Sequence, residues 1–179
     1  MASVVFFRAV NVGLHQRFQP SALAKELAAL GVVNVGAAGT FVVRENISAA
    51  KLQGEILRRL PFKPELMICA AREVLALADG EPFGKTPAGK DVTAFVSVMQ
   101  KEPPSSAELP VDYPEGGKWE IRIAASIGRF ILSFRRPGAK DLYTNAVVER
   151  HFVGAATTRN WNTITAIHKI LAEPALPKK

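Results

Sequence analysis

Residues 32–44, VVNVGAAGTFVVR, decide the fold of the first half of the chain. Two runs rich in β-branched residues, Val32–Val35 and Thr40–Arg44, flank the turn Gly36–Gly39. β-Branched and aromatic residues favour strands, and glycine supplies the backbone freedom that a tight turn requires. The stretch therefore predicts two strands joined by a turn.

A helix is predicted on each side of this pair of strands. The earlier helix begins at Pro20 and stops at Gly31, and the later one has Ser48 as its N-cap and ends at Pro61. The spacing of apolar residues in both segments is that of one helical face. These residues are Leu23, Leu27 and Leu30 in the first helix, and Leu52, Ile56 and Leu60 in the second.

Two further strands enclose the helices. Ser3–Arg8 is a short run of valine and phenylalanine, and Glu65–Cys69 is a second short apolar run. The predicted order is β-α-β-β-α-β, which is the order of the ferredoxin-like unit.

The second half predicts the same order of elements. Strands are expected at 91–100, 119–123, 129–134 and 155–158, and helices at 141–152 and 161–172, while 103–117 has room for one short helix at most. The fold class is therefore α+β: two ferredoxin-like (βαββαβ) subdomains in tandem, with mostly antiparallel sheets and a C-terminal helix. The expected boundaries are 1–79 for the first subdomain with a connecting helix, 80–90 for a linker, and 91–179 for the second.

The composition limits where the protein works and what it binds. The chain has 179 residues, a net charge of +7 and one cysteine, Cys69, so it forms no internal disulfide. No apolar run is long enough to span a membrane, and the expected location is the cytoplasm.

Residues 121–160 hold seven basic and two acidic side chains. Such a block can attract anions or nucleic acid, but ordinary solvated surface charge is the favoured explanation, because seven basic residues in forty do not form a dense run.

No known catalytic motif is present. The chain lacks a phosphate-binding glycine loop and a Gly-x-Ser-x-Gly nucleophile elbow. His15, His151 and His168 lack the spacing of metal ligands, and Cys69 ends a buried strand, where a thiol is usually inert. We therefore expect no metal and no cofactor, and the sequence leaves open whether the protein is an enzyme.

Two short segments carry polar groups suited to an anion. In residues 7–13, FRAVNVG, the candidate binding residues are Arg8, Asn11 and Gly13, where the chain leaves a strand. In residues 157–163, TTRNWNT, they are Thr157, Thr158, Arg159, Asn160 and Trp161, at the start of a helix. The alternative for the second segment is a helix cap by Thr158 or Asn160, with Trp161 in the core and Arg159 paired to a carboxylate.

These segments resemble, along nearly the whole chain, a bacterial family known as domain-of-unknown-function family 1697. Its opening pattern, Leu-Arg-Gly-(Ile/Val)-Asn-Val-Gly, corresponds to residues 7–13, and its closing pattern, Thr-Thr-Arg-Asn-Trp-x-Thr, to residues 157–163. Residues 142–145 resemble its Leu-Thr-Asn segment, which adds Asn145 to the candidates. The resemblance implies two ferredoxin-like subdomains and brings no established activity.

The chain departs from the family pattern at two places. Ala9 stands where the family usually has glycine, and residues 37–40, AAGT, stand where it usually has Gln-Ser-Gly-Asn. The closing segment is therefore the better place to look for a site.

Three functions remain open: a binder of an anionic partner (phosphate, nucleotide or nucleic acid), an enzyme acting on an acidic substrate, and an interaction or oligomeric scaffold.

Overall fold

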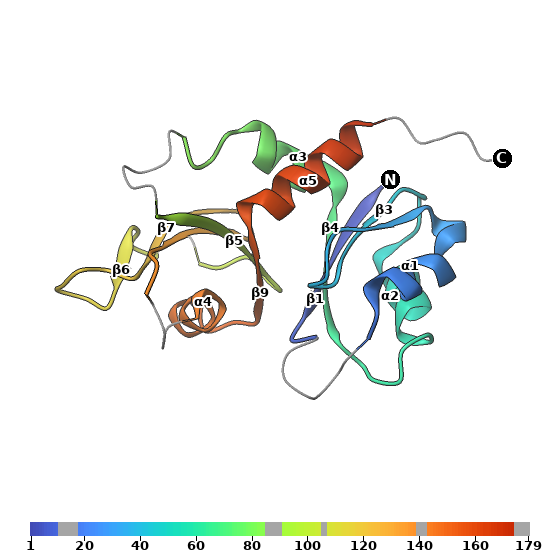
Figure 1. The fold of residues 1–179 in the computed structure, drawn as a ribbon, viewed down its shortest axis with the longest axis horizontal. Helices are drawn as coiled ribbons and strands as arrows, with labels where there is room; N and C mark the ends of the chain where they lie inside the picture. Colours follow the sequence, from blue (N-terminus) through green and yellow to red (C-terminus); the bar gives the residue numbers. More distant parts are fainter. Residues whose placement is uncertain (11–17, 85–90, 105–106, 139–142, 174–179) are drawn as a thin grey trace. The chain divides into compact units, whose positions relative to one another are not determined.

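The computed structural model describes residues 1–10, 18–84, 91–104, 107–138 and 143–173. The chain is a mixed α/β protein with two antiparallel sheets, and the described residues form five α-helices (Figure 1). It divides into two compact units. One comprises Met1–Asp79 and the described residues from Thr165 on, and the other the described residues of Gly80–Ile164. No helix in the described ranges is long and apolar enough to cross a membrane.

The first unit begins with the six elements predicted for the first half. The described residues form β1 (Ser3–Arg8), α1 (Pro20–Glu26), a 3₁₀ turn η1 (Ala28–Leu30), β2 (Val32–Asn34), β3 (Thr40–Val43), α2 (Ala49–Leu57), β4 (Glu65–Ala70) and α3 (Ala71–Asp79). Ser48 caps α2, because its side chain accepts a hydrogen bond from the Lys51 backbone N–H. Gly31, in the left-handed conformation (φ 60°), ends the turn before β2.

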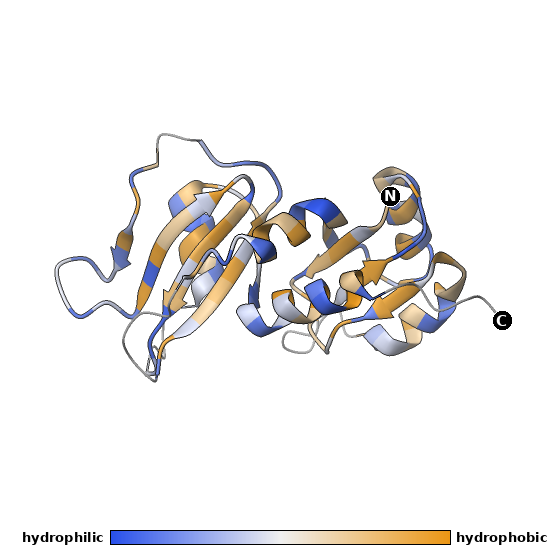
Figure 2. Cartoon of the chain, turned by 90° about the horizontal axis from the view of Figure 1, so that it is seen from above, coloured by the Kyte–Doolittle hydropathy of each residue, from blue (hydrophilic) through white to orange (hydrophobic). Residues whose placement is uncertain are grey.

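The first sheet has the strand order β2-β3-β1-β4 and is antiparallel throughout. Alternate residues of the sheet pack against α1 and α2 and form a hydrophobic core with them (Figure 1). The buried core side chains include Val5, Phe7, Phe41 and Val43 from the strands, with Leu23, Leu27, Leu52 and Ile56 from the helices. The strands are correspondingly the most apolar segments of this unit (Figure 2).

Two polar contacts attach the end of the last helix, α5 (Trp161–Ala172), to the first unit. The Arg44 guanidinium donates to the backbone carbonyls of Ile170 and Glu173, over 2.7 and 2.8 Å. His168 Nε2 lies 2.7 Å from Asp79 Oδ1, at the end of α3. A cation at a helix C-terminus satisfies carbonyls that have no partner within the helix.

The second unit contains five strands and one complete helix within its described residues. These are β5 (Thr93–Met99), β6 (Val111–Tyr113), β7 (Ile121–Ile127), β8 (Phe130–Arg135), α4 (Thr144–Phe152) and β9 (Ala156–Asn160). The turn between β7 and β8 is at Gly128 (φ 54°). Helix α4 covers one face of the sheet, with Ile121, Ile123, Ile131, Val147 and Val148 in the shared core.

The two sheets share a strand order. The second sheet runs β6-β7-β8-β5-β9. When the edge strand β6 is left out, the remaining order is β7-β8-β5-β9. If these four strands are numbered 1 to 4 along the chain, their order is 2-3-1-4, the same as in the first sheet. In each unit one described helix, α2 or α4, lies between the corresponding hairpin (β2–β3 or β7–β8) and the last strand of the sheet.

The second unit differs from the predicted order between its first two principal strands. Residues 103–117 have room for at most one short helix by sequence, and the described part of this segment contains no helix and one strand, β6. Pro103, Pro104, Pro110 and Pro114 explain the difference, because proline lacks the N–H that a helix requires and clashes with the preceding turn.

Candidate functional site

The closing segment, residues 157–163, begins within strand β9, where its side chains alternate between the two faces of the second sheet. Thr157 pairs with Val98 of β5, Thr158 with Ser97, and Arg159 with Val96. Because side chains alternate along a strand, Thr158 lies on the face covered by α4, and Thr157 and Arg159 lie on the opposite face. The predicted residues therefore do not form one continuous site.

A relay of hydrogen bonds joins β9 to α4. Thr158 Oγ1 donates to Asn145 Oδ1 over 2.9 Å, and Ser97 Oγ lies 2.7 Å from Thr158 Oγ1. A hydroxyl has a single proton, so Ser97 is the donor in the second contact. The relay turns the Asn145 amide oxygen toward β9. Within the described ranges, the NH₂ group of Asn145 has no hydrogen-bond acceptor.

Further donors gather at the N-terminus of α4. Tyr143 occupies the N-cap position without a side-chain cap, and the first turn contains no acidic residue. The Thr144 side chain is buried, and its Oγ1 has no hydrogen-bond partner among the described residues. The first N–H groups of a helix have no acceptor within the helix, and the helix dipole places positive charge there. These groups suit an oxyanion.

Arg159 is buried on the other face of β9. Only 7% of the residue is exposed, and burial lowers the pKa of its guanidinium to about 10. The side chain is therefore still charged at neutral pH. Its Nη1 donates to Thr157 Oγ1 and to the Thr158 carbonyl, both over 2.9 Å. These contacts hold the guanidinium against its own strand.

Asn160 and Trp161 form the start of α5. Asn160 Oδ1 accepts from both the backbone N–H and the hydroxyl of Thr163, over 2.9 Å each, which is an N-cap arrangement. The Trp161 ring packs edge-on against Phe83, with centroids 5.1 Å apart. The cap that the sequence offered as an alternative is thus present at Asn160.

The opening segment lies in the first unit. Arg8 Nη1 forms an ion pair with Glu65 Oε2 over 3.0 Å, directly across from it on β4. Ala9 has a φ of 54°, a left-handed conformation that favours glycine, which the family usually has here. Asn11 and Gly13 lie outside the described residues.

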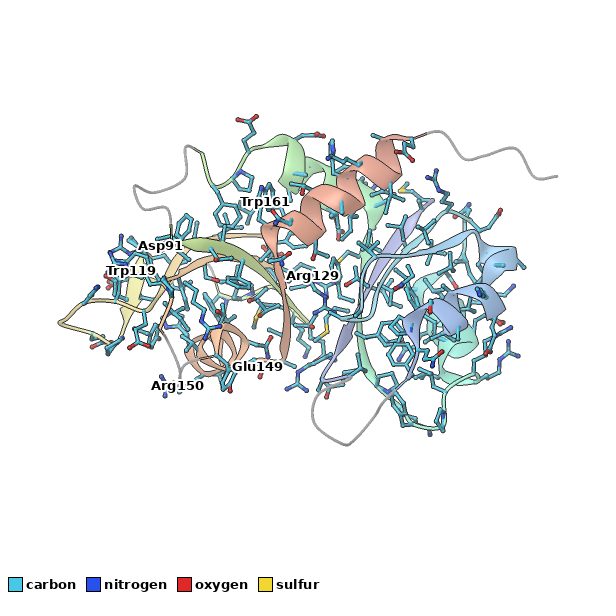
Figure 3. All side chains as sticks on the ribbon, in the orientation of Figure 1. Asp91, Trp119, Arg129, Glu149, Arg150 and Trp161 are labelled. Carbon is cyan, nitrogen blue, oxygen red and sulfur yellow. The ribbon has the colours of Figure 1, made fainter. Side chains whose placement is uncertain are left out.

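A cavity of about 530 Å³ lies at one end of the second sheet. Its lining comes from the segments just before β5 and β7 and just after β8, and Asp91 and Trp119 mark it in Figure 3. The lining residues are Asp91, Val92, Lys118, Trp119, Glu120, Arg136, Pro137 and Gly138. In the described ranges, no three His, Cys, Asp or Glu side chains come together as metal ligands would.

Two guanidinium groups surround the indole of Trp119. The Arg136 guanidinium carbon lies 3.9 Å from the ring centroid, and that of Arg122 lies 4.9 Å away. Arg122 also makes two hydrogen bonds to Asp112, of 2.6 and 2.8 Å. These bonds lower the pKa of the Asp112 carboxyl below its ordinary value.

The basic block of residues 121–160 is largely occupied by contacts within the chain. Five of its seven basic side chains make such contacts. They are Arg122 with Asp112, Arg129 with the Met99 carbonyl, Arg136 with Trp119, Arg150 over the Tyr113 ring, and Arg159 with Thr157. The block is therefore a poor candidate for an open basic surface.

Sequence reasoning missed Ser97 and the cavity. Ser97 lies in the middle of an apolar strand, and its polar position opposite Thr158 is visible only once β5 and β9 are paired. The cavity is assembled from three segments that are distant in sequence. A single signal pointed to it: Lys118, Trp119 and Glu120 place an aromatic ring between opposite charges just before a strand.

The fold and these contacts define a mixed α/β protein with two antiparallel sheets. The chain belongs to the family described as "Protein of unknown function (DUF1697)", whose model matches residues 1–126. That range contains the opening segment and ends before Thr157. The solved structure of a conserved bacterial protein from Streptococcus pneumoniae is similar, with a TM-score of 0.56 and 16% identity. The similarity covers 95% of this chain and 98% of that one, and it shows the fold alone. No curated protein matches the chain.

Proposed function

We propose that this protein binds the phosphate or carboxylate group of a small molecule at the N-terminus of α4. The observation that carries the proposal is the relay from Ser97 through Thr158 to Asn145. It fixes the amide with its oxygen turned toward β9, so that the NH₂ group has a defined direction and no acceptor in the described part of the chain.

Three kinds of donor support an anionic ligand here. They are the NH₂ group of Asn145, the hydroxyl of buried Thr144, and the backbone N–H groups of the first helical turn. A buried hydroxyl without a partner costs about 1–3 kcal/mol, so a ligand that accepts from Thr144 recovers that free energy. The first turn of α4 contains no acidic residue that would compensate the positive end of the helix dipole.

A small anion fits this arrangement better than a nucleic acid does. Binding a nucleic acid backbone requires several cations that are free to contact successive phosphates. In the basic block, five of the seven side chains are engaged with other groups of the chain. The donors at α4 are neutral groups clustered at one helix end, which suits a single oxyanion.

The test is binding of inorganic phosphate to the full chain and to Asn145→Asp, at constant ionic strength. The new carboxylate still accepts from Thr158, and an acid in the first turn stabilises a helix by about 0.3–1 kcal/mol. We therefore expect unchanged or higher stability together with loss of phosphate binding, measured by calorimetry. At a phosphate concentration ten times Kd, the parent protein should gain about 1.4 kcal/mol in stability.

Asn160→Asp is the matched control, because it makes the same change at the start of the neighbouring helix α5. Aspartate caps helices as well as asparagine does, so this variant should fold normally and still bind phosphate. Phosphate binding that survives in Asn145→Asp, or that is lost only in Asn160→Asp, contradicts the proposed site.

The other candidate residues from the sequence remain predictions as ligand-binding residues. Their described contacts are with the chain itself and neither require nor exclude a ligand. They are Arg8, Thr157, Arg159, Asn160 and Trp161.

We further propose that both units are ferredoxin-like subdomains, the second with strand β6 in place of its first helix. The shared strand order 2-3-1-4 supports this interpretation.

With subdomains at 1–79 and 91–179 and a linker at 80–90, limited proteolysis should cut first within 80–90 or 103–117. Early cleavage inside β7 or β8 contradicts the proposal.

A further inference from the structure

We propose that the cavity beside Trp119 binds a small zwitterion, a molecule that carries both an ammonium and a carboxylate group, such as an amino acid or a dipeptide. This site is separate in its residues from the anion site proposed at α4.

The cavity has charges of both signs. Lys118 and Arg136 are cationic, and Asp91 and Glu120 are anionic. Among the described residues, Asp91, Lys118 and Glu120 make no ion pair or side-chain hydrogen bond. Opposite charges that line one cavity without pairing can each be matched by a ligand that enters between them.

The charge pattern selects against ligands of one sign. A simple anion that reaches Lys118 and Arg136 also meets the carboxylates of Asp91 and Glu120. A simple cation that reaches those two carboxylates likewise meets Lys118 and Arg136. Like charges at short range oppose binding, so the unpaired groups discriminate in favour of a molecule with both charges.

Arg136 is fixed in position before any ligand arrives. Its guanidinium stacks on Trp119 at 3.9 Å, and Nη1 donates to the Trp119 carbonyl over 3.3 Å. A planar guanidinium held in this way loses little conformational freedom when it pairs with a carboxylate.

The size and walls of the cavity indicate the kind of molecule. About 530 Å³ lies within the 300–1,000 Å³ typical of small-molecule sites. Trp119 is only 9% exposed and has two guanidinium groups over its ring, so little aromatic surface remains for stacking a nucleobase. Val92, Pro137 and Gly138 provide a short apolar wall.

The experiment uses tryptophan fluorescence and three matched probes. The chain has two tryptophans, so Trp161→Phe leaves Trp119 as the only one. The probes are the dipeptide Ala-Ala, its N-acetylated form, which keeps the carboxylate alone, and its C-terminal amide, which keeps the ammonium alone. We expect a saturable fluorescence change with Ala-Ala, and at least tenfold weaker binding of each singly charged form.

Two variants separate the charges. Asp91 and Lys118 are exposed, so Asp91→Asn and Lys118→Gln should fold normally. Asp91→Asn should weaken the binding of Ala-Ala and of its amide by about tenfold and leave the binding of the acetylated form unchanged. Lys118→Gln should weaken the binding of Ala-Ala and of the acetylated form by about tenfold and leave the binding of the amide unchanged. Lys63→Gln, an exposed lysine in the first unit, should change nothing.

Three results overturn the proposal: no saturable signal with Ala-Ala by fluorescence or calorimetry, equal affinity for all three probes, or tighter binding of the acetylated form than of Ala-Ala.

Discussion

Thr158 of β9 donates a hydrogen bond to Asn145 of α4 over 2.9 Å, and this contact sets the direction of the Asn145 amide. Without the Thr158 hydroxyl, nothing in the described residues distinguishes the amide oxygen from the amide nitrogen. The anion-binding role of Asn145 therefore depends on a residue that need not touch the ligand.

Thr158→Val should weaken phosphate binding several-fold and lower the free energy of unfolding by about 1–3 kcal/mol. Valine has the same shape but leaves Ser97 and Asn145 without their shared partner. Thr158→Ser keeps the hydroxyl and should bind phosphate as the parent does. Equal phosphate affinity in the valine and serine variants, measured by calorimetry, would show that the relay does not orient Asn145.

The turn between β2 and β3 depends on Gly39. Its φ is 67°, and a Cβ added there would lie 2.8 Å from Phe7 Cβ and 3.1 Å from Val10 Cγ2. Gly39→Ala should therefore cost about 2–4 kcal/mol, through a strained backbone and an overpacked core. Gly36 also has a positive φ, of 75°, but open space around it, so Gly36→Ala should cost only about 1 kcal/mol. Urea unfolding of both variants measures the difference, and equal losses would contradict the steric explanation.

Most of the fold follows from local signals in the sequence. Residues 32–44 predicted the strands now seen as Val32–Asn34 and Thr40–Val43, because valine-rich runs and glycines act within a few residues of each other. The same holds for the Ser48 cap of α2. Strand β6 was missed, because its three residues gain their conformation by pairing with β7 rather than from their own pattern.

The site was less accessible to sequence reasoning. The sequence predicts residues 157–163 as one cluster, with the strand ending at Thr158, whereas β9 continues to Asn160. Those two extra residues place Arg159 and Thr158 on opposite faces, which only the strand pairing reveals. The cavity beside Trp119 depends on three distant segments, and no local pattern encodes that meeting.

Ala9→Gly should raise the free energy of unfolding by about 0.5–1 kcal/mol. Ala9 is exposed and has a φ of 54°, where an L-residue pays a steric cost that glycine avoids. Ala22, exposed within α1, is the opposite case, and Ala22→Gly should cost about 1 kcal/mol, since glycine weakens a helix. A loss of stability in Ala9→Gly, measured by urea unfolding, would show that another constraint holds this backbone.

The Asp112–Arg122 pair should make stability depend on pH in the acid range. Hydrogen bonds from Arg122 lower the pKa of Asp112 in the folded protein. A carboxyl with a lowered folded pKa stabilises the fold above its unfolded pKa, and this stabilisation is lost as pH falls through the folded pKa. The loss therefore begins below about pH 4.

Asp112→Asn should accordingly be less stable than the parent at pH 7, and the difference should shrink toward pH 2–3. Urea unfolding at several pH values measures it. Glu108→Gln, at an exposed carboxylate, should leave the pH profile nearly parallel to that of the parent. A constant difference between Asp112→Asn and the parent at all pH values would contradict the role of the ion pair.

Arg159→Gln should lower the free energy of unfolding by roughly 2–4 kcal/mol while leaving phosphate binding intact. The guanidinium is buried and bonded to Thr157 and to the Thr158 carbonyl, and hydrogen bonds to charged groups contribute about 1.5–3 kcal/mol. Arg58, on the surface and paired with Glu55, is the size-matched control, and Arg58→Gln should cost at most about 1 kcal/mol. Thermal unfolding with and without phosphate measures both effects. An unchanged melting temperature in Arg159→Gln, together with loss of the phosphate effect, would instead make Arg159 the anion-binding residue and remove the site from α4.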